Sequence, residues 1–183
     1  SSISAIVGAA SLAAGVGGTG VAVSVGIAGA YNEISNNVAA FVANVDDGVE
    51  TKNNGDISIE AYNNAAINSI TFAASLSAGF GGTGVAVSCA GAGAGNIIVN
   101  TADAYVSGST VHSAGALVLT ARDSATINAV VAALSASVAG GGTGVGVSLG
   151  GSFAVNLIGS ELERSGVQAS IINSHVGADD ALT

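Results

Sequence analysis

The stretch GGTGV at residues 17–21 returns at residues 81–85 and 141–145. The spacings are 81 − 17 = 64 and 141 − 81 = 60 residues. A glycine-rich turn of this composition can cradle the phosphates of a dinucleotide, but such a site needs a single turn followed by a helix. A motif that recurs about every 60 residues is instead typical of stacked repeat architectures. We therefore predict that each copy is the corner of one repeat, with no cofactor bound.

Alternating residue types surround each corner. The segments VAVSVGIAGA, VAVSCAGAGAG and VGVSLGGSFAV follow the three corners and change character at every second residue. This period, with many Val, Ile and Thr residues, predicts β-strands. The glycines predict a tight reversal of the chain, because glycine adopts positive φ without steric cost. Each repeat is thus expected to contain one long hairpin. The predicted turn positions are Gly17, Gly18, Thr19, Gly20, Gly81, Gly82, Thr83, Gly84, Gly141, Gly142, Thr143 and Gly144.

A third and a fourth strand are expected in each repeat. The third strands are predicted at residues 34–42, 98–106 and 157–164. After a polar turn, the fourth strand starts at Ile57, Leu117 or Leu182 and continues into the next hairpin.

The predicted repeats are residues 1–66, 67–126 and 127–183, the last one truncated, in one continuous stacked domain. The final strand stops at Thr183 where the earlier copies continue, so we expect the chain to be a fragment of a longer protein. The predicted fold is all-β and β-solenoid-like, built from stacked repeats of about 60 residues. The alternative is an antiparallel β-sandwich or meander.

Three asparagines hold equivalent places in the repeats. Asn32, Asn96 and Asn156 each lie twelve residues after the last glycine of their corner. Stacking would place them in a row, and identical Asn side chains hydrogen-bond along cross-β and solenoid stacks. We therefore predict a structural ladder at these positions.

Composition limits the possible functions. The formal net charge is −9, with only three Lys and Arg residues, which argues against a nucleic-acid partner because such proteins need basic patches. No charged residue lies between Glu60 and Asp103, and the chain contains no proline. Flat, uncharged, proline-free strands are an aggregation hazard in a monomer but a suitable assembly surface in a stacked array. We therefore expect the partner to be the chain itself or neighbouring repeats.

Few residues have the chemistry of a site. Cys89 is the only cysteine, so no internal disulfide can form, and we expect it to be a small buried residue. Asp46 and Asp47 could hold Ca²⁺, but GGTGV lacks the aspartate of calcium-binding β-roll repeats, and a solvated charged turn is the preferred interpretation. His112 and His175 are expected to be exposed turn residues.

The sequence contains no catalytic set. No GxSxG elbow is present, and no His–Asp pair is placed to activate a serine. Glu161 and Glu163 lie two residues apart, which could suggest a glycosidase pair, but beside Arg164 they are better explained as a charged surface strand. We therefore predict that the protein is not an enzyme.

The aligned repeats resemble the Gly/Ala/Val-rich repeat regions of very large secreted bacterial surface and adhesin-like proteins. The similarity rests on GGTGVAVS, on the Asn-x-Ile-x-Asn pattern at residues 32–36 and 96–100, and on the strand GDISIEA. The third repeat departs from the pattern, since Ser160 replaces the second Asn. The resemblance implies a structural role at the cell surface or outside the cell, in which β-solenoid-like repeats form a stalk or fibre.

Three hypotheses follow. The first is a structural module that stacks along one axis into an extracellular fibre or adhesin stalk. The second is a module whose surface binds carbohydrate, such as cell-surface or matrix glycans, or ice. The third, an enzyme of the polysaccharide-lyase type on a β-helix, fits less well because the three basic residues lie in separate repeats.

Overall fold

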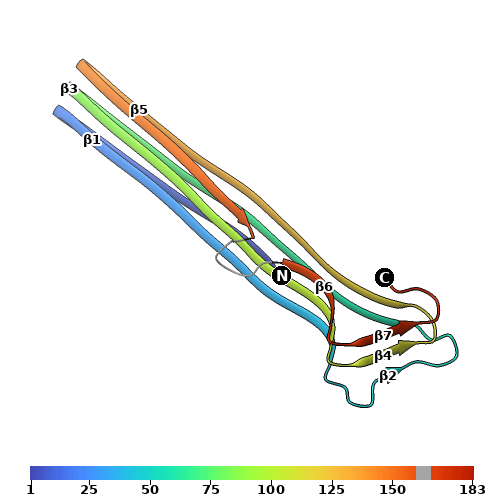
Figure 1. Ribbon diagram of the computed structural model, residues 1–183. Coiled ribbons are helices and arrows are strands. Elements are labelled where there is room, and N and C mark those ends of the chain that lie inside the picture. Colours follow the sequence, from blue (N-terminus) through green and yellow to red (C-terminus); the bar gives the residue numbers. More distant parts are fainter. Residues whose placement is uncertain (160–165) are drawn as a thin grey trace.

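The computed structural model is a long, narrow molecule with its loops gathered at one end (Figure 1). The structure describes residues 1–159 and 166–183. In this part of the chain there are seven strands and no helix, so the predicted all-β class is confirmed. Three long strands dominate: β1 (Ser2–Ala43), β3 (Ile57–Ser107) and β5 (Leu117–Ile158). The short strands are β2 (Val49–Glu50), β4 (Thr110–Ser113), β6 (Gly166–Ile172) and β7 (His175–Ala178).

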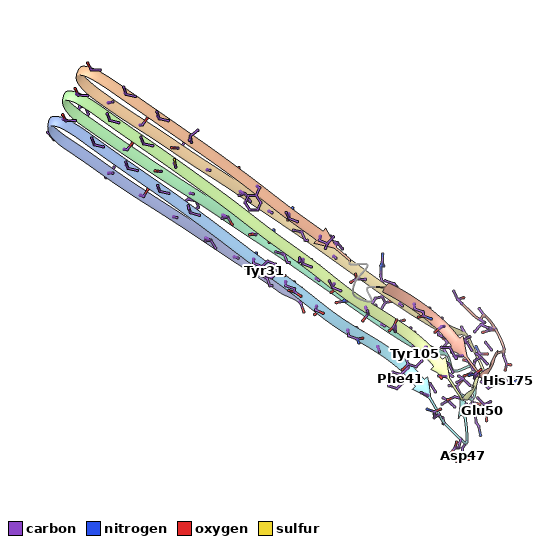
Figure 2. The ribbon with its side chains drawn as sticks, turned by 60° about the vertical axis from the view of Figure 1, so that its left-hand side comes forward. Tyr31, Phe41, Asp47, Glu50, Tyr105 and His175 are labelled. Atoms are coloured by element: carbon purple, nitrogen blue, oxygen red, sulfur yellow. The ribbon has the colours of Figure 1, made fainter. Side chains whose placement is uncertain are left out.

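Each long strand folds back on itself at its GGTG corner, so that one strand supplies both arms of a flat loop (Figure 2). We call each such loop a layer, the end with the corners the tip, and the opposite end the base. β1 pairs in parallel with β3 from Ser2↔Ala66 to Ala43↔Ser107. β3 pairs in parallel with β5 from Ile57↔Leu117 to Ile98↔Ile158. The strand order β1-β3-β5 is therefore a stack of layers, which confirms the predicted solenoid-like architecture.

The hydrogen bonding refines the predicted hairpin. All the strand pairs recorded for residues 1–159 and 166–183 are parallel and join one layer to the next. The two arms of a layer meet through their side chains instead, as where Ser11 Oγ and Ser24 Oγ lie 2.6 Å apart. The antiparallel sandwich or meander is therefore not the arrangement of these strands. The expected boundary before a third strand at residue 34 is also wrong, because β1 continues through it.

The interior between the arms is built from small side chains near the tip and larger ones near the base. Ala22 and Ala86 are buried close to the corners, whereas Ile67 and Ile98 are fully buried farther away. At the base, Leu117 joins a further aliphatic cluster with Ile59, Val106 and Val111. Because inner side chains near the tip are little more than methyl groups, the arms there lie close together, and the larger residues face outward.

The base carries a second, smaller sheet in the order β2-β4-β7, again with parallel pairs. Leu182 then bridges Leu117 in parallel, and Leu117 N–H donates to Ala181 O at 2.8 Å. Residues 181–183 thus lie beside β5 in the place where a further layer would begin.

The third layer is longer than the second. β3 pairs with β5 at an offset of 158 − 98 = 60 residues, but with β6 at 166 − 101 = 65 residues. Five additional residues (65 − 60) are therefore accommodated between Ile158 and Gly166. A strand is predicted at residues 157–164, but β5 is described only as far as Ile158. The rest of that prediction, with Ser160, Glu161, Glu163 and Arg164, lies outside the described residues.

Candidate functional site: the edges and outer faces of the stack

The backbone is closely packed at the GGTG corners. A Cβ added at Gly84 would lie 2.5 Å from Gly79 O and 2.7 Å from Gly140 O, so no larger residue fits without a shift of the backbone. Among the predicted turn glycines in the described residues, only Gly141 has a positive φ, of 141°. The sequence interpretation based on positive φ is therefore wrong for most of them. At Gly84 the requirement is room for neighbouring backbones.

The corner threonines form one exposed row. Thr19 pairs in register with Thr83, and Thr83 with Thr143, and all three are exposed. No helix follows these corners in the described residues, since each strand continues directly into its second arm. The helix N-terminus on which dinucleotide phosphates rest is thus missing beside each corner.

The predicted asparagines lie in a hydrogen-bonded row. Asn32 Nδ2 donates to Asn96 Oδ1 at 2.8 Å, and Asn96 Nδ2 donates to Asn156 Oδ1 at 2.8 Å. Asn96 is fully buried between its partners. The row therefore gives each layer the same polar contact with the next at one fixed place, which favours the in-register pairing.

A serine cluster, which sequence reasoning missed, crosses the interior. Ser88 Oγ donates to Ser75 Oγ at 2.8 Å, and Ser75 Oγ donates to Ser24 Oγ of the adjacent layer at 2.9 Å. In the third layer Ser148 Oγ donates to Ser135 Oγ at 3.0 Å. The recurrence of Ser four residues after each corner was the available signal, but the partner on the other arm becomes evident only when the arms are folded together.

In the described part of the chain, the stack has two open edges. β1 and β5 are the outer strands of the order β1-β3-β5. Ala66 N–H donates to Ser1 O, so Ser1 points to the second layer. Because successive backbone groups of a strand point to opposite sides, the even-numbered residues of this arm, including Ala10, direct their N–H and C=O groups to the free edge. Such a row is a template for another strand.

The two broad outer faces carry the large apolar side chains. The first-arm face is made by exposed residues that precede the corners: Ile6, Leu12, Val16, Ile70, Phe72, Leu76, Phe80, Val130, Leu134 and Val138. The second-arm face is made by exposed residues that follow them: Val21, Val23, Val25, Ile27, Tyr31, Val145, Val147, Leu149, Phe153, Val155 and Leu157. Contiguous apolar surface on this scale marks interaction sites in soluble proteins.

A shallow groove runs along the second-arm face. Its floor contains Gly91, Gly93 and Gly95 of the middle layer, and its open volume is ≈ 560 Å³. Tyr31 and Phe153 line it from the two neighbouring layers, and the ring of Phe153 lies over Gly93. Cys89 continues the same face and is half-buried there, not fully buried as expected. The tyrosine hydroxyl donates to Glu33 Oε2 at 2.8 Å, and this hydrogen bond, followed by desolvation and the nearby carboxylate charge, raises the pKa of Tyr31.

Several ionisable side chains lie at the base, among them Asp47, Glu50 and His175 (Figure 2). Asp46 and Asp47 are exposed in the turn before β2. His112 Nε2 lies 3.5 Å from Asp179 Oδ1, and both side chains are largely exposed. His112 and His175 lie in strands β4 and β7, so their assignment to turns is wrong.

No group of three or more His, Cys, Asp or Glu side chains within residues 1–159 and 166–183 is arranged to hold a metal ion. This includes the surroundings of Asp46 and Asp47, the residues considered for Ca²⁺. The same part of the chain contains no helix with the length and apolarity needed to cross a membrane. The comparisons with protein-family models, curated proteins and solved structures found no match to this chain.

Proposed function

We propose that this chain is a structural repeat module, which extends by β stacking into an extracellular fibre or adhesin stalk at a cell surface. The observation that carries the proposal is the pair of open edges. β1 and β5 expose backbone groups on opposite sides of the same stack, and both follow the register that already joins β1 to β3 and β3 to β5.

The edges support growth in one direction. If β5 of one stack pairs with β1 of another, the asparagine row can continue from Asn156 to a new Asn32. The contact joins two different surfaces, so it does not close on itself, and repetition generates a filament. The next stack can come from another molecule or from neighbouring repeats of the same chain.

Residues 181–183 also support growth at the edge, because this short segment already adds to β5. They add to β5 at Leu117, where Leu119 N–H donates to Thr183 O at 2.9 Å. The edge of β5 therefore accepts a parallel strand at its base end. A complete arm in that position would extend the stack by one layer.

Electron microscopy of the wild-type chain and of Ala10→Pro tests the proposal. Proline at position 10 removes an N–H that points to the free edge of β1. Pairing of another stack with this edge should therefore be blocked, while the pairing of β1 with β3 persists. We expect wild-type filaments with an axial repeat, and particles at least several-fold shorter for Ala10→Pro. Ala10→Val keeps the N–H and should retain wild-type length. Compact monomers at all concentrations would contradict the proposal.

A second candidate function, binding of glycans or ice, is favoured by the exposed row of Thr19, Thr83 and Thr143. Threonines in register along parallel strands repeat at about 4.8 Å and present a regular set of hydroxyl and methyl groups. One row at a narrow tip offers little area, which places this function second. Glycan arrays and an ice-recrystallisation assay, with Thr83→Ala as the test variant, separate it from the structural role.

A further inference from the structure

The apolar outer faces have a feature that edge stacking does not use. In the middle layer, a hollow on one face lies directly behind a bulky side chain on the other. Ser75 and Ser88 face each other across the interior, with their Oγ atoms 2.8 Å apart. Phe72 lies three residues from Ser75 in the direction of the base. Gly91 lies three residues from Ser88 in the same direction on the other arm. Both point outward, on opposite faces.

Five residues from the same two serines in the direction of the base are Ile70 and Gly93, so Ile70 lies behind Gly93. The layer therefore keeps a nearly constant thickness, with its bulk shifted to the first-arm face and its hollow on the second-arm face. The hollow is the groove of ≈ 560 Å³ floored by Gly91, Gly93 and Gly95. A copy of the molecule displaced along the normal to its faces would bring its Phe72 over Gly91, where a Cβ would meet nothing within 4 Å, and its Ile70 over Gly93, which the ring of Phe153 covers.

Aromatic rings make the rest of both faces smooth. A Cβ at Gly93 would lie 2.6 Å from Phe153 Cζ, and a Cβ at Gly140 would lie 3.0 Å from Phe80 Cδ1, so each ring lies over a glycine of the adjacent layer. Phe72 lies over Gly8 in the same way. Because these rings fill the places of missing side chains, the two outer faces are flat. A flat face can pack against another flat face.

We infer that the first-arm face of one molecule packs on the second-arm face of a second copy of this chain, with the Phe72 side chain packed against the glycine groove at Gly91. Large side chains then meet small ones across the interface, as in the dry interfaces between stacked β-sheets. The contact joins two different faces, so it propagates and widens the assembly sideways. It does not depend on the edge pairing of the proposed function.

The size and charge of the faces fit this occupant. Three layers about 4.8 Å apart and about 13 residues at roughly 3.3 Å each give a face of about 600 Å². Two such faces bury about 1,200 Å² in total, within the range of specific interfaces. On the second-arm face, Glu33 lies at the base end of this area, and no acidic or basic residue lies between it and the corner of β1.

A lipid surface fits less well. Proteins that lie on membranes place Lys and Arg around their apolar face. Here the net charge is −9, and Lys52 and Arg122, the two basic residues in the part of the chain that the structure describes, belong to neither face as defined. Anionic lipids would therefore repel the protein, whereas a second copy meets uncharged surface with uncharged surface.

Cross-linking through the only native cysteine tests the arrangement. Ala74 and Cys89 are each one residue toward the base from Ser75 and Ser88, so Ala74 lies behind Cys89. Both positions are half-exposed. In the Ala74→Cys variant, the new thiol of one copy should face Cys89 of the next. Mild oxidation is expected to give a ladder of covalent dimers, trimers and larger species on a non-reducing gel. Ala39→Cys, at an exposed alanine nearer the base, is the matched control and should give at least ten-fold less product.

A charge in the groove should abolish the ladder. Gly91→Glu has open space for its side chain, because a Cβ there meets nothing within 4 Å. In the Ala74→Cys background we expect at least a ten-fold loss of cross-linked product. Gly166→Glu is the control, since a Cβ at that exposed glycine also meets nothing within 4 Å, but the residue lies in β6, outside both faces. Circular dichroism and denaturant titration establish that each variant is folded.

The outcomes separate this inference from the proposed function. Filaments of wild-type length that become narrower in Gly91→Glu support face packing, as do short Ala10→Pro particles that still cross-link. Absence of the Ala74→Cys ladder from folded protein overturns the inference, even if filaments form. Dimers joined only through two Cys89 residues would also overturn it, because they require like faces to meet. Binding to anionic vesicles with no self-association overturns it as well.

Discussion

The ring of Phe41 stacks on the ring of Tyr105 in the next layer, with centroids 5.1 Å apart and planes inclined by 8° (Figure 2). The two residues are also partners in the β1–β3 ladder. In-register parallel pairing thus places one residue type over its own kind, and aromatic rings, amides and hydroxyls all form rows. The stability of the stack depends on many such repeated contacts between layers, because each layer has only a thin interior.

The asparagine row should be most sensitive at its centre. Asn96→Ala removes two hydrogen bonds and leaves the Asn32 amide without its acceptor. At about 1 kcal/mol for each bond and about as much for the unpaired group, we expect a loss of about 3 kcal/mol in the free energy of unfolding. Urea denaturation followed by circular dichroism measures this.

Asn156→Ala is the control for that experiment. Asn156 is exposed at the end of the row and accepts one bond, and its loss leaves Asn96 Nδ2 without an acceptor, so Asn156→Ala should cost about 1–2 kcal/mol, less than Asn96→Ala. Equal effects at the two positions would mean that the row contributes no cooperative stabilisation.

The glycines of the layers should divide into strict positions, such as Gly84 at a corner, and tolerant positions, such as Gly29 in an arm. Gly84→Ala forces a methyl group against two backbone oxygens and should cost at least about 1–3 kcal/mol, as overpacking does. Gly29→Ala places its methyl in open space and should be neutral or stabilising by up to about 1 kcal/mol, because alanine restricts the unfolded chain. Thermal unfolding of the two variants checks the contrast. A large loss for Gly29→Ala would show that these contacts do not govern glycine use.

The Tyr31 hydroxyl should titrate above its ordinary range. The hydrogen bond to Glu33, desolvation and the carboxylate charge all favour the protonated phenol and so raise its pKa. Because the folded-state pKa is raised, the stabilisation from this bond is complete below the ordinary tyrosine pKa of about 10 and disappears as pH rises through the folded value. Ultraviolet titration of tyrosinate should show one transition moving to lower pH in Glu33→Gln. An unchanged titration curve would argue against the Tyr31–Glu33 pair.

Hydrogen exchange should distinguish the layers. Within residues 1–159 and 166–183, β3 is bonded on both sides, β1 is bonded on one side, and the outer side of β5 is bonded only at its base end, by residues 181–183. Amides of β3 should therefore exchange more slowly than those of β1 and β5 at dilution, where assembly is minimal. Raising the protein concentration should slow exchange in β1 and β5 selectively if edges pair between molecules. Uniform protection of all three strands at every concentration would contradict the layer model.

The sequence predicted the class and stacking of the strands but not the partners of their backbone groups. Period-two alternation identifies an extended strand whether it pairs within a hairpin or between layers. The reversal at GGTG is also common to both arrangements. The structure pairs Val21 with Val85 of the next layer, so the register depends on contacts between segments more than sixty residues apart.

The sequence was least informative about which side of each strand faces inward. Alternation of Val with Ala or Ser normally places valine inside. Here Ala22 and Ser24 are buried, whereas Val21 and Val23 are exposed. Two arms can approach closely only through their small residues, and Gly84 shows how little room remains near the corner. The expected burial of Cys89 failed for the same reason, since it shares the outward side of its strand.

The parallel ladders also make the molecule mechanically anisotropic. Traction applied along the stacking axis loads the interlayer hydrogen bonds in tension and can peel the layers apart one at a time. Traction applied along the arms must shear a whole ladder at once, because dozens of bonds resist together. A tether of this design would yield stepwise in one direction and remain stiff in the other.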